Sequence, residues 1–211
     1  MTRLDPTRMP ELMSHDRSRL NELLETTAVA HVAFVDEDGR PGVLPTAVAR
    51  LGERLVVHGS TGSRWMRLVG GSPAVLSITA VDGVVVARSA FESSIAYRSA
   101  VVVGSFTVLE GAEKLAALDV LTDRLLPGRV AEVRRPTKKE LAATLLLAMP
   151  LESWSLRISD GWPEDPEEDV ATDAWAGIAW FGERPVSAIT APDVRDGIPV
   201  PVSVEGLRAR L

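Results

Sequence analysis

The stretch that decides the fold class begins with Ala28-Val29-Ala30-His31-Val32-Ala33-Phe34-Val35 and continues through the turn Asp36-Glu37-Asp38-Gly39 into Gly42–Arg50. The first run is apolar and rich in β-branched residues, which favours a strand. It follows Asp16–Thr26, whose leucines lie at helical spacing, so the periodicity changes at Ala28. The acidic turn ends in glycine and predicts that Gly42–Arg50 returns as the second strand of a hairpin.

Further strands are predicted on both sides of short turns, including the turn Val81-Asp82-Gly83. These strands are Arg54–His58, Ala74–Ala80, Val84–Arg88, Tyr97–Leu109 and Leu147–Ile158. Helices are predicted for Asp16–Thr26, capped by Ser14 or Asp16, for Gly111–Leu126, and for a segment that begins at the capping box of Thr137 and Glu140. Many short strands with few helices predict a mainly β protein, a barrel or sandwich with flanking helices. The irregular order argues against a Rossmann-type sheet.

Composition excludes several classes of function. A length of 211 residues suggests one domain, and a net charge of −6 argues against nucleic-acid binding. No apolar run approaches the ~18–20 residues of a membrane span, and the N-terminus lacks the apolar segment of a secretory signal, so we expect a cytoplasmic protein. Cysteine is absent, which removes disulfides and thiolate chemistry. The sequence contains no P-loop, dinucleotide fingerprint or nucleophile elbow.

The C-terminal part of the chain differs in character from the rest. Gly161–Asp173 is acidic without any basic residue, which is typical of a solvated connector. Four of the five tryptophans follow residue 150. We therefore expect two parts, a barrel over 1–160 and an extension over 161–211 that packs on the barrel or on a second subunit.

The most informative loop is His58-Gly59-Ser60-Thr61-Gly62-Ser63-Arg64. A strand is predicted to end at His58 and a helix to begin near Ser63. Glycines, hydroxyls and an arginine at a helix start suit a phosphate group. The alternative is that Ser63 only caps the helix and the glycines form a tight turn.

Two other features leave alternatives open. His31 lies mid-strand among apolar residues, which favours a core or interface histidine over a ligand, whereas His58 adjoins the glycine loop. The segment Arg88–Ser99 joins two strands and contains arginines, serines and the single tyrosine. It predicts either a polar pocket or a salt-bridged corner.

In combination and in this order, several short segments resemble the pyridoxamine 5'-phosphate oxidase-like flavoproteins, in particular the branch akin to nitroimidazole reductases. The matching segments are Ala30–Phe34, Leu44–Thr46, Leu55–Arg64, Asp82–Phe91, Tyr97–Gly104, Pro127–Arg129, the helix at Glu140-Leu141, and Asp173–Gly177. The resemblance implies a split β-barrel homodimer with FMN at the subunit interface. It also implies an oxidoreductase that carries electrons from a nicotinamide donor to a small acceptor, with the flavin supplying the chemistry.

The resemblance further implies the residues that contact the flavin. The phosphate loop would comprise His58, Gly59, Ser60 and Thr61, with Ser63 and Arg64 as principal contacts. The strand Leu44-Pro45-Thr46 would run beside the isoalloxazine ring, and Ser99 and Arg98 would approach it from a neighbouring strand. Trp175 would come from the second subunit.

One departure from the family pattern bears on catalysis. Members of this branch read Phe-His-His-Ser-x-Asn-Tyr-Arg-Ser where this chain has Phe91 to Ser99, so both histidines and the asparagine are replaced, by Glu92, Ser93 and Ala96. The chain has lost two proton carriers at this loop. This favours cofactor binding over family-typical catalysis. The alternatives are a deazaflavin-dependent reductase, or a non-catalytic module that binds flavin, or haem through His31 or His58.

Overall fold

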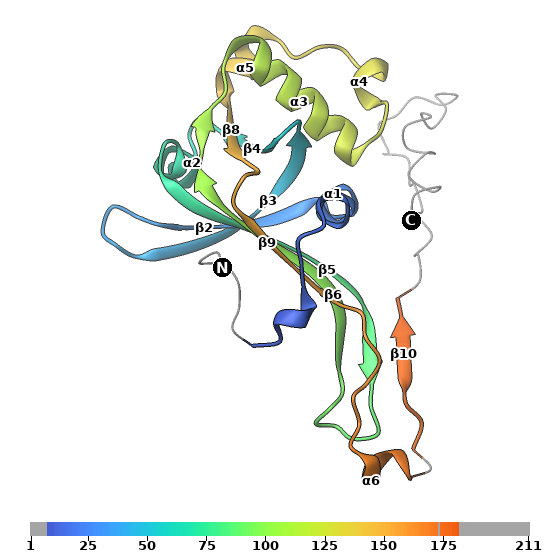
Figure 1. The fold of residues 1–211 in the computed structure, drawn as a ribbon. Helices are drawn as coiled ribbons and strands as arrows, with labels where there is room; N and C mark the ends of the chain where they lie inside the picture. The colour runs from blue at the N-terminus through green and yellow to red at the C-terminus, as the bar shows by residue number, and fades with distance from the viewer. Residues whose placement is uncertain (1–7, 173, 182–211) are drawn as a thin grey trace, which may run out of the picture.

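The computed structural model describes residues 8–172 and 174–181 (Figure 1). The described residues form one antiparallel sheet with the strand order β1-β9-β6-β5-β2-β3-β4-β8-β7, and β10 pairs with β5. Its strands are β1 (Met13–Ser14), β2 (Val29–Val35), β3 (Pro41–Leu51), β4 (Arg54–Ser60), β5 (Pro73–Val86), β6 (Ser94–Ser105), β7 (Thr107–Val108), β8 (Thr144–Pro150), β9 (Trp154–Ser159) and β10 (Gly177–Trp180). Its helices are the 3-10 turn η1 (Pro10–Leu12), α1 (Arg17–Thr26), α2 (Arg64–Val69), α3 (Gly111–Leu125), α4 (Arg129–Glu132), α5 (Lys138–Ala143) and α6 (Glu167–Val170).

The curved sheet encloses an apolar core, which confirms the mainly β prediction. Alternate residues of each strand face this core, as the two-residue period of a strand requires. In β2, Ala30 and Val32 are buried while His31 faces away. The core also contains Leu55, Leu76, Ile78, Val102, Phe106, Leu147, Met149 and Leu156.

Helices cover parts of the barrel. The predicted cap of α1 is confirmed, because the Asp16 carboxylate accepts a hydrogen bond from the Ser18 backbone N–H at 2.8 Å. Leu20 and Leu23 of this helix are fully buried against the core. On the outer surface α3 packs Ala117 and Leu121 into a second apolar cluster formed with Ala49, Val56, Leu146 and Ala148.

Two predicted strand boundaries are wrong. Val81-Asp82-Gly83 is not a hairpin turn, because β5 runs through it as one strand with a bulge at Asp82. The predicted strand Leu147–Ile158 is two strands, β8 beside β4 and β9 beside β6. Whether a strand continues or ends at these two places depends on which neighbouring strand it pairs with. The local residue pattern carries no information about that neighbour.

A long arm formed by the outer halves of β5 and β6 projects from the barrel, and β10 lies along it (Figure 1). Trp180 pairs with Gly83, and a Cβ at Gly83 would lie 2.7 Å from the Ala179 carbonyl oxygen. The glycine therefore lets β10 approach closely. The short strand β10 packs on β5, whereas residue 173 and residues 182–211 lie outside the described residues. The division at residue 160 stays a prediction.

The acidic connector contains a buried anchor, which corrects its interpretation as uniformly solvated. The Asp165 side chain is only 1% exposed and accepts hydrogen bonds from the Arg88 backbone N–H and guanidinium, both at 2.8 Å. The bond holds the chain that follows β9 against the end of the arm. No local pattern in the sequence connects this pair, because its members are 77 residues apart.

The predicted capping box of α5 is confirmed. The Glu140 carboxylate accepts the Thr137 backbone N–H at 2.7 Å, and the Thr137 hydroxyl accepts the Glu140 N–H at 3.2 Å. Arg134 adds two bonds to the same carboxylate, at 2.6 and 2.8 Å. Together these bonds lower the pKa of Glu140 to about 2, and the bonds from Arg134 make the largest contribution.

This lowered pKa predicts acid fraying of α5. A carboxylate whose folded pKa lies below its ordinary value stabilises fully above that value and less as pH falls toward the folded pKa. We expect Glu140 to titrate near pH 2 by NMR, and protection of the α5 amides from exchange to fall as pH drops below 4.5. In Glu140→Gln this loss of protection should be present already at neutral pH. A Glu140 that titrates near 4.5 would contradict the arrangement.

Candidate cofactor site

The phosphate loop predicted from sequence is a tight turn between β4 and α2. The Ser63 N–H donates to the Ser60 carbonyl at 2.9 Å, and the Gly62 N–H donates to the Ser60 hydroxyl at 3.1 Å. The Thr61 N–H is held by the Ala143 carbonyl at 3.0 Å, next to β8. The prediction of a helix from about Ser63 is confirmed, since α2 begins at Arg64.

The hydroxyl of Ser63 is the feature that separates the two interpretations of this loop. Ser63 occupies the N-cap position of α2, yet its side chain makes no capping hydrogen bond. Simple capping therefore does not explain the serine. Its hydroxyl remains able to donate to a ligand.

Gly59 has a packing role. It faces the barrel core, where a Cβ would lie 3.1 Å from Met66 Cγ of α2. The absence of a side chain thus lets α2 close the end of the barrel. His58 precedes it and faces away from the core, since its neighbour Val57 is buried inside.

Two arginines of α2 differ in their surroundings. The Arg67 guanidinium donates to the Thr61 carbonyl at 2.8 Å and so braces the loop. The exposed Arg64 side chain makes no hydrogen bond or ion pair with any described residue. Both line an open cleft of about 610 Å³ between α2 and the turn that joins β2 to β3. Arg64 is therefore a cation available to an anionic group.

The strand predicted to run beside the flavin ring has two faces. Leu44 and Thr46 lie opposite Val32 and Ala30, on the core side of the sheet. Pro45 lies opposite His31, on the outer side. Only Pro45 of the three thus shares the outer face with a histidine.

In the described part of the chain, the helices leave part of this outer face exposed. His31 pairs with Pro45 on one side and Ser77 on the other, and Val29 and Val43 are exposed nearby. Further along, Thr79 lies opposite Ser99. The face is therefore apolar with a few hydroxyls and one imidazole near its centre.

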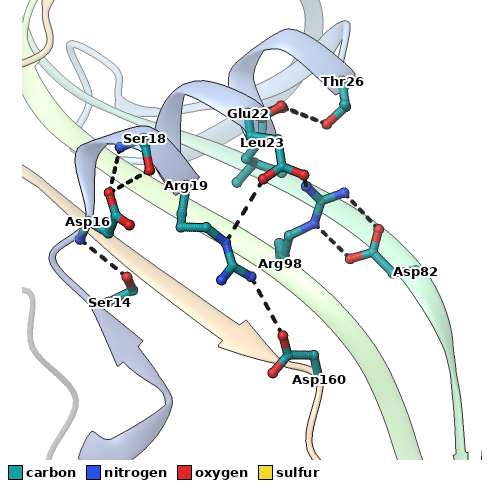
Figure 2. Close-up of polar contacts among 10 residues, drawn as sticks. All are labelled: Ser14, Asp16, Ser18, Arg19, Glu22, Leu23, Thr26, Asp82, Arg98 and Asp160. Carbon is teal, nitrogen blue, oxygen red and sulfur yellow. Dashed lines mark hydrogen bonds and ion pairs between the residues drawn. The ribbon is translucent and has the colours of Figure 1, made fainter. Parts of the chain in front are cut away.

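Arg98 and Ser99 are neighbours on β6 and therefore point to opposite faces of the sheet. The Arg98 guanidinium binds Asp82 at 2.8 and 2.9 Å and Glu22 of α1 at 3.2 Å (Figure 2). The hydrogen bonds that Arg98 donates to Asp82 raise the pKa of Arg98. The predicted salt-bridged corner is what the structure shows for this residue, which fastens α1 to the bulge at the base of the arm.

The loop that departs from the family pattern is held by its own serines. The Ser93 hydroxyl accepts the Ala87 N–H at 3.1 Å and donates to the Ser89 carbonyl at 2.9 Å. The Ser89 hydroxyl accepts the Glu92 N–H at 3.2 Å. These residues close a turn at the end of the arm. Ser93 contributes to this turn through its side chain, and Glu92 contributes through its backbone N–H.

Trp175 does not join the loop at Arg64 within one chain. Its ring lies over Gly177 at the start of β10, and it is 67% exposed. Figure 1 places β10 and α2 at opposite ends of the molecule. A contact between Trp175 and a flavin at the loop would require a second subunit and stays a prediction.

Some site features have no signal in the sequence. Val35 at the end of β2 and Glu37 in the following turn line the same cleft as Arg64. No local sequence pattern connects these two residues with Arg64. Among the described residues, no group of three or more histidines or carboxylates could hold a metal ion. None of the helices there is long and apolar enough to cross a membrane.

The antiparallel barrel, its arm and the basic turn after β4 define a split β-barrel of the type found in flavoproteins. Residues 16–158 match the family described as pyridoxamine 5'-phosphate oxidase, and the chain belongs to this family. The resemblance recognised from sequence is thereby confirmed.

Three solved structures share the fold. The FAD and haem binding protein from Mycobacterium smegmatis is 50% identical with a TM-score of 0.90, over 93% of this chain and 97% of that one. The flavocytochrome Anf3 from Azotobacter vinelandii is 28% identical with a TM-score of 0.87, over 95% and 94%. A proposed 5-nitroimidazole antibiotic resistance protein from Bacteroides thetaiotaomicron is 14% identical with a TM-score of 0.58, over 69% and 86%, and shows the fold alone. No curated protein matches the chain.

Proposed function

We propose that this chain is a cytoplasmic oxidoreductase that binds a flavin and haem and passes electrons from a nicotinamide donor to a small acceptor. The observation that carries the proposal is the uncovered outer face of the sheet, which holds His31 among apolar side chains and ends beside the unpaired Arg64. Two of the similar structures support it, because one is named for FAD and haem and the other as a flavocytochrome. These names favour FAD over the FMN expected from sequence.

The donor set at the loop fits a flavin phosphate. Arg64 can give two parallel hydrogen bonds to phosphate oxygens, and the Ser63 hydroxyl can give a third. A bound flavin would supply the hydride and electron chemistry, and the protein would supply binding and orientation. The hydrogen bonds of the turn between β4 and α2 fix the backbone from which both donor side chains extend.

The histidines are the side chains that fit haem. Cysteine is absent from the sequence, so neither thiolate ligation nor attachment through a Cys-x-x-Cys-His motif is available. The His31 imidazole stands on an apolar surface and has no hydrogen-bond partner among the described residues, which suits an axial ligand of haem. His58 lies next to the phosphate loop, so we assign haem to His31.

The same face supports a homodimer with the cofactors at the subunit interface. Val43 is 60% exposed and Val29 47% exposed, and both lie on a face that a second copy could bury. In such a dimer Trp175 of the partner subunit would have access to the flavin. Light scattering of the loaded protein would report the mass of two chains.

Absorption spectra of the purified protein test the proposal. We expect bound flavin and, with added haem, a Soret band that is lost in His31→Ala and kept in His58→Ala and in the control His15→Ala. A nicotinamide donor should then bleach the flavin band. A protein that keeps neither cofactor through gel filtration, or that binds a deazaflavin in preference to FAD, would overturn it.

A further inference from the structure

The cleft beside α2 shares only Arg64 with the phosphate loop and is otherwise lined by residues outside it. It has a volume of about 610 Å³ and lies between Val35, Asp36 and Glu37 on one side and Arg64, Arg67 and Leu68 on the other. The phosphate of FMN would need only Arg64 and Ser63. The other residues that line the cleft have no role in the function proposed so far.

We propose that this cleft binds the adenylate half of FAD and thereby selects FAD over FMN. The inference rests on the proposed function, since it assumes that a flavin phosphate lies at Arg64. FAD differs from FMN by a second phosphate, a ribose and an adenine ring. Each of these three groups has a chemical counterpart on the cleft walls.

The two arginines fit the diphosphate. Arg64 and Arg67 are three positions apart on one helix, which places their side chains on neighbouring parts of its surface. The bond from Arg67 to the Thr61 carbonyl uses one Nη, and its guanidinium retains other N–H groups for an anion. Two positive charges match a linkage that carries two negative charges.

Glu37 fits the ribose hydroxyls. The Asp36 carboxylate is already occupied, since its Oδ1 accepts the Asp38 and Arg40 N–H groups at 3.0 and 2.8 Å. The Glu37 side chain has no partner among the described residues. A free carboxylate near a diphosphate site is the group that dinucleotide-binding proteins use for ribose hydroxyls. It would also repel a ribose that carries a further phosphate.

Two aliphatic side chains fit the adenine ring. Val35 is the last residue of β2 and is 65% exposed, and Leu68 faces the cleft from α2. An adenine between them would bury apolar surface that is otherwise in contact with water. The nicotinamide donor carries the same adenosine diphosphate group, so an experiment must separate these two sources.

Fluorescence titration of the full chain with FAD and FMN tests the inference. We expect FAD to bind at least tenfold more tightly than FMN. Glu37→Ala should weaken FAD about tenfold, the effect of losing one or two hydrogen bonds to a charged group, and leave FMN unchanged. The control Asp38→Asn, in the same turn and paired only with Arg40, should change neither affinity. AMP, which is the part of FAD that FMN lacks, should compete with FAD but not with FMN.

Several results would overturn the inference while leaving flavin binding intact. These are equal affinities for FAD and FMN, an equal loss of both in Glu37→Ala, or no loss of FAD in that variant. Competition of AMP with NADH but not with FAD would assign the cleft to the donor instead. Failure to bind either flavin would contradict the proposed function itself.

Discussion

Arg64→Ala is expected to weaken the binding of FAD and FMN alike, by about 10- to 100-fold. A hydrogen bond to a charged group contributes about 1.5–3 kcal/mol, and each 1.4 kcal/mol corresponds to a factor of ten in affinity. Arg64 has no competing partner in the described structure, so the whole of its hydrogen-bonding capacity is available to the phosphate. Fluorescence quenching of free flavin on binding gives both dissociation constants.

Two further variants separate charge from geometry. Arg64→Lys keeps the charge but loses the planar pair of donors, and we expect it to recover only part of the affinity. Arg54→Ala removes an equal charge at the start of β4, where the arginine pairs with Glu113, and should leave both constants unchanged. The advantage of wild type over Arg64→Ala should shrink at high salt, because Arg64 is exposed. Equal flavin affinity in Arg64→Ala and wild type would remove the loop from the site.

Asp165→Ala is expected to cost about 3 kcal/mol of stability, because removal of one member of a buried ion pair leaves the other uncompensated. The Arg88 guanidinium is 27% exposed, which keeps the expected loss at the low end of the range for fully buried pairs. Its Nε is buried and has no hydrogen-bond partner in the described structure, so water does not readily replace the lost carboxylate there. Urea unfolding measures the change.

The neighbouring acidic residue provides the control. Glu164→Ala removes the same charge from the same segment at an exposed position and should change stability by less than about 0.5 kcal/mol. Limited proteolysis should cleave the segment 161–172 faster in Asp165→Ala than in Glu164→Ala. If the two variants unfold at the same urea concentration, the segment is not anchored through Asp165.

Features that depend on near neighbours in the chain were predictable. The caps of α1 and α5, the hairpin of β2 and β3, and the turn before α2 agree with the structure. Each of these depends on contacts between residues a few positions apart, which propensity and spacing describe directly. The resemblance to the pyridoxamine 5'-phosphate oxidase family was visible for the same reason, because its short motifs lie in order along the chain.

Features that depend on distant neighbours were not predictable. The bulge at Asp82 changes which residues of β5 are buried, from even-numbered positions such as Ile78 before it to odd-numbered positions such as Val85 after it. Arg98 consequently meets Asp82 and α1, whereas Ser99 takes the opposite face. A short motif that contains both residues cannot show this division, since it depends on the pairing of β5 with β6.

The amino-acid sequence was sufficient to predict the mainly β fold class, the helix caps and the arginine loop after β4, because each is encoded in contacts within a few residues. The cleft that Glu37 shares with Arg64 and the anchoring of Arg88 by Asp165 arise only in the folded chain. Such pairs form where strand register brings remote segments together, and register depends on the packing of the whole sheet rather than on any one segment of it.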